Sequence, residues 1–330
     1  MRRKIVLLLL MMILLTCVSY SQTQEKDRSG TFSLYFENDT VAGTDRCFTG
    51  GAKLGWMSKD LKNYKEKKIW RWFPFVDKPG FQHTFAFSLG MNIYTPDDIS
   101  RTDIIEDDRP YAGFLYLAAG IHNISRRILD SWEFYIGIVG PHSYAEQTQK
   151  FIHTIITGVY PEGWDNQLKD ELALQLIYER KWKFPSSDSR EGLGFDAIPH
   201  LGGGLGNVYI YTSTGVQVRL GWNLPEDFGF PLIRPGGDAS LGLNTRGPFS
   251  VYAFAALDGK VVLRNIFLDG NTFQDSHSVD KNPFTLDLIT GIGIRMGRFN
   301  ISYAYVFWTK KFKTETRNQV FGALNFSYSY

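Results

Sequence analysis

The sequence has little cysteine, no surplus of either charge sign, and no long apolar run beyond its first residues. Only Cys17 and Cys47 are cysteines, and Cys17 falls in a segment that we expect to be removed, so Cys47 would have no intrachain partner. Basic and acidic residues number 36 and 34, which argues against a nucleic-acid-binding protein with a strong basic patch. No later segment has the roughly 18 consecutive apolar residues of a spanning helix.

The first 21 residues predict a secretory signal peptide. Arg2 to Lys4 form a positive start, and the apolar run from Ile5 to Leu15 is too short to span a bilayer. We therefore expect residues 1–21 to be a signal peptide and residues 22–330 to form one exported domain. A lipoprotein signal ending at Cys17 is the alternative.

Aromatic residues and glycine are abundant, and signals for helices are few. Aromatics make up 15% of the chain and there are 32 glycines. An exported, aromatic, glycine-rich and helix-poor chain is typical of an outer-membrane β-barrel of a Gram-negative bacterium. A secreted β-sandwich has a similar composition and stays open at this point.

Apolar and polar residues alternate with a period of two from residue 30 onward, which predicts strands. The same alternation recurs at 48–58, 82–93, 111–124, 131–140, 171–183, 194–205, 208–223, 249–257, 261–268, 284–297, 299–312 and 318–330. Most runs have the length of a tilted strand that crosses a bilayer. No linker or composition break divides the chain, so we expect one all-β transmembrane antiparallel barrel.

These runs number thirteen, whereas a barrel with both chain ends in the periplasm needs an even number. The weakest separation is Asp258-Gly259-Lys260, between 249–257 and 261–268. We therefore predict twelve strands, with fourteen as the alternative. The last run ends on alternating aromatics, including Tyr328 and Tyr330, and such a strand is typical of substrates of the barrel assembly machinery.

One helix is predicted, over residues 143–157. Ser143 is a suitable N-cap, and Glu146 three residues later would complete a capping box. At about 100° per residue, Glu146, Gln149 and His153 share a polar face. Phe151 and Ile155 lie opposite, and we expect them to pack the helix on the barrel wall or to line an acyl groove.

Strand parity places three polar clusters at one rim of the predicted barrel. The first includes Asn38 and Asp39, whose amide and carboxylate oxygens suit Ca²⁺, although a solvated hairpin turn is the alternative. The second includes Arg109, which could hold a phosphate or form a structural ion pair with a neighbouring aspartate. The third is the helix with His153, a candidate general base for activating water; an inert surface histidine is the alternative.

Ordered motifs in the mature chain resemble the lipid A 3′-O-deacylase (LpxR-type) family of outer-membrane proteins. They are FENDTVAGTDRCFTGG, YTPDDI, DDRPYAGFLY, GIVGPHSYAEQTQKFIHTI, GWDNQL, VVLRNIFLDG and NPFTLDLITGIGI. The resemblance implies a twelve-stranded barrel with its site between the wall and a loop helix. It also implies hydrolysis of the 3′-acyloxyacyl ester of lipid A (lipopolysaccharide), with Ca²⁺ and a histidine. We expect a monomer among outer-membrane lipids, although the sequence leaves the oligomeric state open.

Carried over to matching positions, the resemblance makes His153 the general base and Asn38 and Asp39 the polar pair at the metal. Thr49 matches a polar site residue, and Arg109 matches a basic substrate-binding position; we group Gln149 with Arg109. The sequence departs from the family pattern at Cys47, Gly50 and Asp108. Two other functions stay open, a non-catalytic barrel acting as a pore or structural anchor and a phospholipase A-type esterase.

Overall fold

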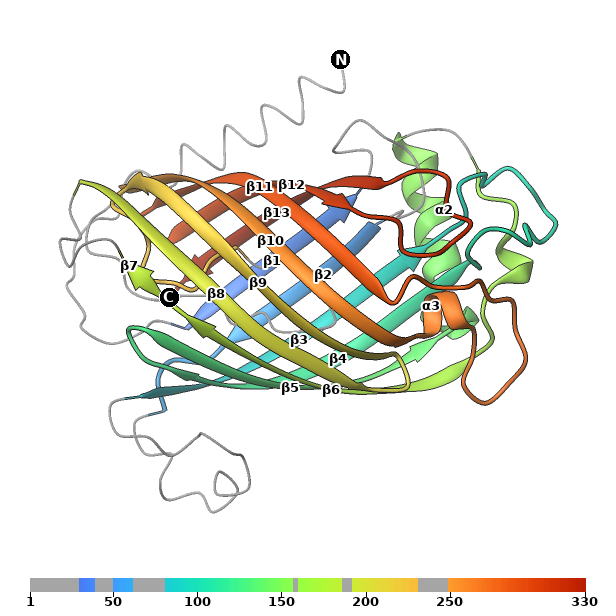
Figure 1. Ribbon diagram of the computed structural model, residues 1–330, viewed down its shortest axis with the longest axis horizontal. Coiled ribbons are helices and arrows are strands. Elements are labelled where there is room, and N and C mark those ends of the chain that lie inside the picture. The colour runs from blue at the N-terminus through green and yellow to red at the C-terminus, as the bar shows by residue number, and fades with distance from the viewer. Residues whose placement is uncertain (1–29, 39–49, 62–80, 157–159, 186–191, 231–248) are drawn as a thin grey trace.

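Twelve long antiparallel strands close into a barrel (Figure 1). The computed structural model describes residues 30–38, 50–61, 81–156, 160–185, 192–230 and 249–330; the expected signal peptide and Cys47 lie outside these ranges. Strand β1 (Thr31–Asn38) pairs with β2 on one side and β13 on the other, and β6 pairs with β8, which completes the ring. The other barrel strands are β2 (Gly50–Met57), β3 (Gln82–Tyr94), β4 (Ala112–Ile124), β5 (Ile128–Val139), β6 (Glu171–Trp182), β8 (Leu193–Gly206), β9 (Tyr209–Trp222), β10 (Phe249–Asn265), β11 (Phe284–Met296), β12 (Phe299–Trp308) and β13 (Gln319–Ser329).

The predicted count of twelve is confirmed, and a two-residue strand, β7 (Phe184–Pro185), adds an extra pairing beside β8. The runs 249–257 and 261–268 are not two strands, because β10 continues through the three residues that separate them and α3 (Ile266–Asp269) follows it. Asp258 and Lys260 face the lumen, where Lys260 forms an ion pair with Asp287 of β11. The charged residues whose pattern suggested a turn therefore occupy lumen-facing positions of one long strand.

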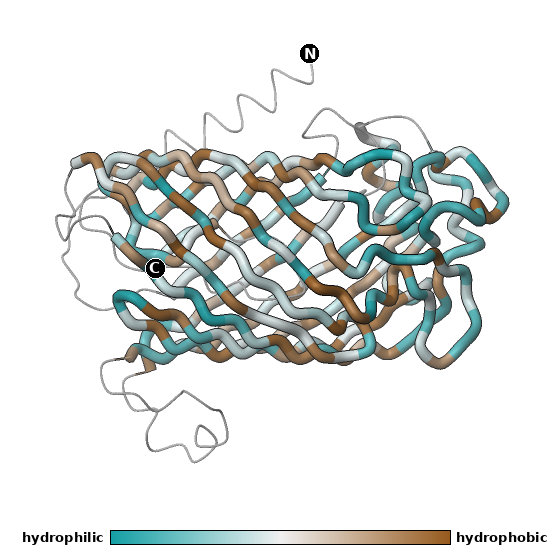
Figure 2. The backbone as a smooth tube through the Cα atoms, in the orientation of Figure 1, coloured by the Kyte–Doolittle hydropathy of each residue, from teal (hydrophilic) through white to brown (hydrophobic). Residues whose placement is uncertain are grey.

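Side chains alternate between a lipid-facing outer surface and the lumen. On β1, Phe32 and Leu34 are 54% and 44% exposed, whereas Tyr35 and Glu37 are buried. Figure 2 shows this alternation along the wall, with hydrophilic residues gathered at the loop end on the right. Among the described residues, no helix is long and apolar enough to cross a membrane.

The lumen is closed at the loop end by α3. Phe267 is fully buried and stacks on Tyr94 with ring centroids 4.2 Å apart. Phe114 and Tyr209 also contact the Phe267 ring. The short helix therefore closes the loop end of the lumen with a cluster of aromatic side chains.

At the other end, the residues after β9 fold into the lumen. Phe230 stacks on Phe254 of β10 at 5.0 Å, and the buried Arg219 pairs with both Asp196 and Asp227. Together with the aromatic cluster between the ends, these contacts occupy much of the described lumen. An internal cavity remains beside them, lined by residues that include Tyr94, Lys260 and Asp287.

The predicted helix is present as α2 (Ala145–Ile156), but its capping box is wrong. A 3₁₀ turn, η4 (Pro141–Ser143), comes first, and the Ser143 hydroxyl donates to the Gly140 carbonyl at 2.6 Å. Tyr144 has a left-handed backbone, φ 57°, and its carbonyl accepts the first helical hydrogen bond from Thr148. Glu146 pairs with Lys150 at 2.6 Å. The 3₁₀ turn that follows the end of β5 occupies Ser143, so the helix begins two residues later than predicted.

Helix α2 runs across the long axis of the barrel at its loop end (Figure 1). It contacts β4 and β3. Gly113 on β4 shares the outward parity of Leu117, and a Cβ at Gly113 would overlap Ser143 Oγ and Ala145 Cβ. Only a residue without a side chain lets the helix come this close.

The helix turns its polar side to the wall, which reverses the expected orientation. Ala145, Gln149 and His153 are buried, whereas Phe151 is 67% exposed. The expectation that Phe151 packs α2 on the wall is therefore wrong, and the side chain of Ile155 lies outside the described set. The exposed side of the helix thus carries Phe151, whereas its wall-facing side carries Gln149 and His153.

We expect Gly113→Ala to weaken the docking of α2 by about 1–3 kcal/mol, because the added methyl overfills a closed contact. Hydrogen exchange of the α2 amides should speed up, while heat-dependent gel migration still reports a folded barrel. The matched control is Gly259→Ala on the outer wall, where a Cβ meets nothing nearer than 3.7 Å. Equal exchange in both variants would contradict the close packing.

Candidate active site

One row of outward-facing positions crosses four neighbouring strands beneath α2. Glu37 pairs with Gly51, which brings Asn38 level with Gly50; Gly50 pairs with Ile93, and Ile93 pairs with Gly113. The row therefore runs from Asn38 on β1 to the docking point of the helix on β4. Strands lie about 4.8 Å apart, so its ends are separated by about 14 Å.

Helix α2 runs along this row, so His153 lies closer to the Asn38 end of the row than Ala145 does. The chain leaves β5, passes over β5 and β4 as η4, and then contacts β4 and β3 as α2, so its continuation points toward β2 and β1. His153 is eight residues after Ala145, about 12 Å further along the helix axis. Two of the predicted clusters thus approach each other on the outer face, and His153 is only 4% exposed there.

The outer wall beside Asn38 is closely packed at Gly50. A Cβ at Gly50 would lie 3.2 Å from Asn38 Nδ2 and 2.8 Å from the Glu37 carbonyl oxygen. Asn38 itself is half-buried at the end of β1. The lack of a side chain at Gly50 therefore leaves room for the Asn38 amide on the outer face.

Asp39 and Thr49, the other residues expected beside Asn38, lie outside the described residues. Within the ranges that are described, no group of three His, Cys, Asp or Glu side chains is arranged to hold a metal ion. Asn38 is thus the one predicted metal ligand that the structure places.

Trp164, Tyr111 and Gln149 form a buried cluster, here called the bracket, that holds α2 over this row of strand positions. The Trp164 indole nitrogen donates to Gln149 Oε1 at 2.7 Å, and Trp164 packs on Tyr111 with ring centroids 5.0 Å apart. Ile93 and Ala145 belong to the same buried cluster. Gln149 is 1% exposed, so the structure places this predicted substrate-binding residue in the bracket.

Sequence reasoning missed the roles of Trp164 and Tyr111, although both stand in motifs that carry the family resemblance. Tyr111 donates from its hydroxyl to the Ile99 carbonyl at 3.2 Å. Burial raises the pKa of Tyr111 to about 12, so the phenol stays neutral and keeps this hydrogen bond at neutral pH. The bracket is therefore insensitive to pH in the range where a histidine titrates.

Arg109 lies on the inner side of the barrel mouth. Its guanidinium is 5.1 Å from the ring centroid of the lumen-facing Tyr94, and both line an internal cavity with Glu37 and Asp287. Arg109 is 3% exposed. The structure therefore does not bring Arg109 together with His153 and Asn38, which face outward.

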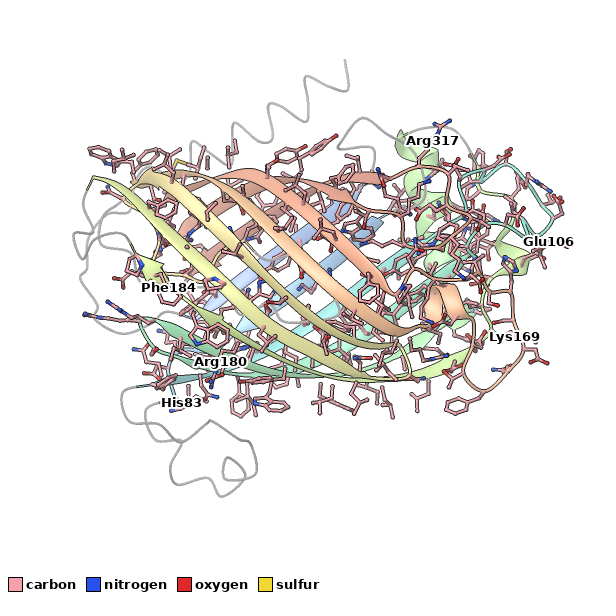
Figure 3. The ribbon with its side chains drawn as sticks, in the orientation of Figure 1. His83, Glu106, Lys169, Arg180, Phe184 and Arg317 are labelled. Carbon is pink, nitrogen blue, oxygen red and sulfur yellow. The ribbon has the colours of Figure 1, made fainter. Side chains whose placement is uncertain are left out.

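His142, the other histidine of this loop, faces solvent. Its side chain is 71% exposed and its Nδ1 contacts the Asp170 carboxylate. Figure 3 shows the loops around Glu106 extending beyond α2 at this end, while His83 and Arg180 mark the opposite end. Its exposure makes His142 a natural control for His153.

Comparisons with known proteins agree with this architecture. A family model described as outer membrane protein LpxR matches residues 7–330. The solved structure of LpxR from Salmonella typhimurium is similar with a TM-score of 0.74 and 18% sequence identity, covering 91% of this chain and 100% of that one. The translocator domain of the autotransporter NalP from Neisseria meningitidis has a TM-score of 0.40 and 10% identity, covering 100% and 98%. A search of curated protein sequences gave no match.

The family match spans nearly the whole chain, and the likeness to the Salmonella structure confirms the closed twelve-stranded fold. The resemblance first seen in the ordered motifs is thereby confirmed. The chain belongs to the LpxR family of outer membrane proteins.

Proposed function

We propose that this protein is an outer-membrane deacylase of lipid A that hydrolyses the ester of the 3′-linked acyloxyacyl group. The observation that carries the proposal is a buried histidine, His153, on the wall-facing side of a helix that packs on the outside of β4 and β3. A site on this side of the barrel meets a lipid substrate without passage through the lumen. Residues 1–21 serve as the export signal in this proposal.

In the proposed reaction His153 works as a general base. Its neutral imidazole takes a proton from a water molecule, and the resulting hydroxide attacks the ester carbonyl carbon. When the tetrahedral intermediate collapses, the bond between the carbonyl carbon and the sugar oxygen breaks. The imidazolium returns its proton to that oxygen, which leaves as an alcohol, and the fatty acid is released as a carboxylic acid that then loses its proton to water. Direct attack by water fits a chain without a GxSxG nucleophile motif.

The residues at the end of β1 fit a Ca²⁺ ion. Asn38, whose side chain lies on the outer face at the end of β1, offers an amide oxygen, and Asp39 follows it in sequence with a carboxylate. Asn38 and Asp39 would hold the ion, with Thr49 as a further oxygen donor. When bound, Ca²⁺ supplies positive charge that stabilises the oxyanion.

The height of the candidate site along the barrel wall favours lipid A as the substrate. In the outer leaflet the acyl chains of lipid A lie along the barrel wall and its phosphates lie above them at the rim. An ester between chain and sugar comes level with the upper end of the strands, where Asn38 and Gly113 lie. A glycerophospholipid ester at similar depth is the alternative substrate.

We expect His153→Ala to reduce deacylation by about 10²–10⁴-fold, because the attacking water loses its base. Mass spectrometry of lipid A incubated with the purified variant would measure the loss of the 3′ acyl pair. His142→Ala on the same loop should retain the activity of the parent protein. Unchanged deacylation by folded His153→Ala would reject the assignment of the base.

Removal of divalent cations should abolish deacylation, and added Ca²⁺ should restore it, because the carbonyl oxygen loses its electrostatic partner. Calorimetric titration with Ca²⁺ provides a readout that does not depend on activity, and Asn38→Ala should weaken the binding. Asn300→Ala, at the opposite end of the barrel on β12, is the control. Calcium affinity unaffected by Asn38→Ala would remove Asn38 from the metal site.

Lipid A and phosphatidylethanolamine should be compared as substrates in the same detergent, with and without a chelator. We expect chelator-sensitive release of acyl chains from lipid A. Release of acyl chains from phosphatidylethanolamine alone would favour a phospholipase A-type esterase. Release from neither lipid would favour a non-catalytic barrel.

A further inference from the structure

Two large aromatic residues are exposed at α2, and we call them the Tyr144–Phe151 stripe. Tyr144, directly before the first helical residue, is 58% exposed, and Phe151 within the helix is 67% exposed. Phe151 lies about 200° around the helix from the buried Gln149 and His153. Its side chain is therefore opposite the wall-facing side of α2.

Tyr144 combines a strained backbone conformation with an exposed aromatic side chain. Its φ of 57° is a left-handed conformation that glycine or asparagine adopts with less strain. The ring is not used for packing inside the described protein, since more than half of it is exposed. A bulky aromatic at a strained and uncovered position indicates a contact outside the chain.

The stripe adjoins the lipid-facing surface of the barrel. Leu115 lies two residues beyond the docking point Gly113 on β4; it pairs with Ile138, and Ile138 pairs with Leu172 of β6. Leu172 is 60% exposed and Leu117 is 58% exposed, so the outward apolar surface reaches within one outward step of the helix. Aromatic residues at this boundary are typical of membrane proteins, because an amphipathic ring suits the headgroup level.

We propose that the Tyr144–Phe151 stripe is seated in the outer leaflet, at the boundary between the lipid headgroups and the acyl chains. The occupant of this face is therefore lipid hydrocarbon and not a protein partner. Continuity with the apolar wall selects lipid, since a membrane that covers Leu117 and Leu172 also reaches the neighbouring helix face. The ion pair between Glu146 and Lys150 lies on the flank of the helix, where headgroups and water remain accessible.

This seating has a consequence for access to the candidate site. With the outer side of α2 in lipid and its inner side on the wall, the wall-facing side chains of Gln149 and His153 lie at the membrane surface. A lipid would approach them laterally, around the helix. The proposal concerns the position of α2 in the membrane and holds whether or not His153 is a catalytic base.

Single-cysteine labelling tests the proposal directly. In a background with Cys17→Ala and Cys47→Ala, each of Phe151→Cys, Leu117→Cys and Glu106→Cys would carry an environment-sensitive fluorophore in phosphatidylcholine vesicles. Leu117 is the reference on the outer wall, and Glu106 lies in the loops beyond the helix (Figure 3). Nitroxides placed on the acyl chains and aqueous iodide serve as the two quenchers.

We expect the label at position 151 to emit at shorter wavelength than the label at 106 and to be quenched by acyl-chain nitroxides, as at 117. Iodide should quench the label at 106 and spare those at 117 and 151. Quenching of the 151 label by iodide alone would place the stripe in water and overturn the proposal. Quenching by neither reagent would show a protein partner or a second copy covering the stripe, which also overturns it.

Discussion

The close contact between α2 and the barrel wall at Gly113 is the constraint on which the outer-face site depends. A barrel wall normally presents side chains to lipid, and those side chains would hold a helix at a distance. Here Gly113 lies under Ser143 and Ala145, so the helix rests on the backbone of β4. With its start fixed there, the straight helix determines where His153 lies, two turns further on.

The surroundings also decide which face of the helix turns inward. In a water-soluble protein an amphipathic helix buries its apolar side, because water is the other environment. Here Phe151 faces outward, as the proposed seating of α2 in lipid would favour, while Gln149 accepts a hydrogen bond from Trp164 on the inside. The same reversal applies to the strands, whose apolar residues face lipid and whose charged residues, such as Asp258 and Lys260, face the lumen.

Sequence reasoning predicted the architecture well because period-two alternation and even strand number are strong constraints on a closed barrel. It predicted α2 within two residues of its start, but the capping box was wrong because Ser143 bonds backward to Gly140. The helix orientation was also wrong, since a period of 3.6 gives two faces and does not say which one meets lipid. Asp39 and Thr49 stay predictions.

Arg109 illustrates a limit of parity arguments. Counting strands places a loop at one end of a barrel, but it does not say on which side of the wall each side chain of that loop will lie. The loop before β4 sends Arg109 inward over Tyr94, whereas Tyr111, two residues later, packs outward under Trp164. One short segment thus contributes to both the packing at the mouth of the lumen and the packing beneath α2.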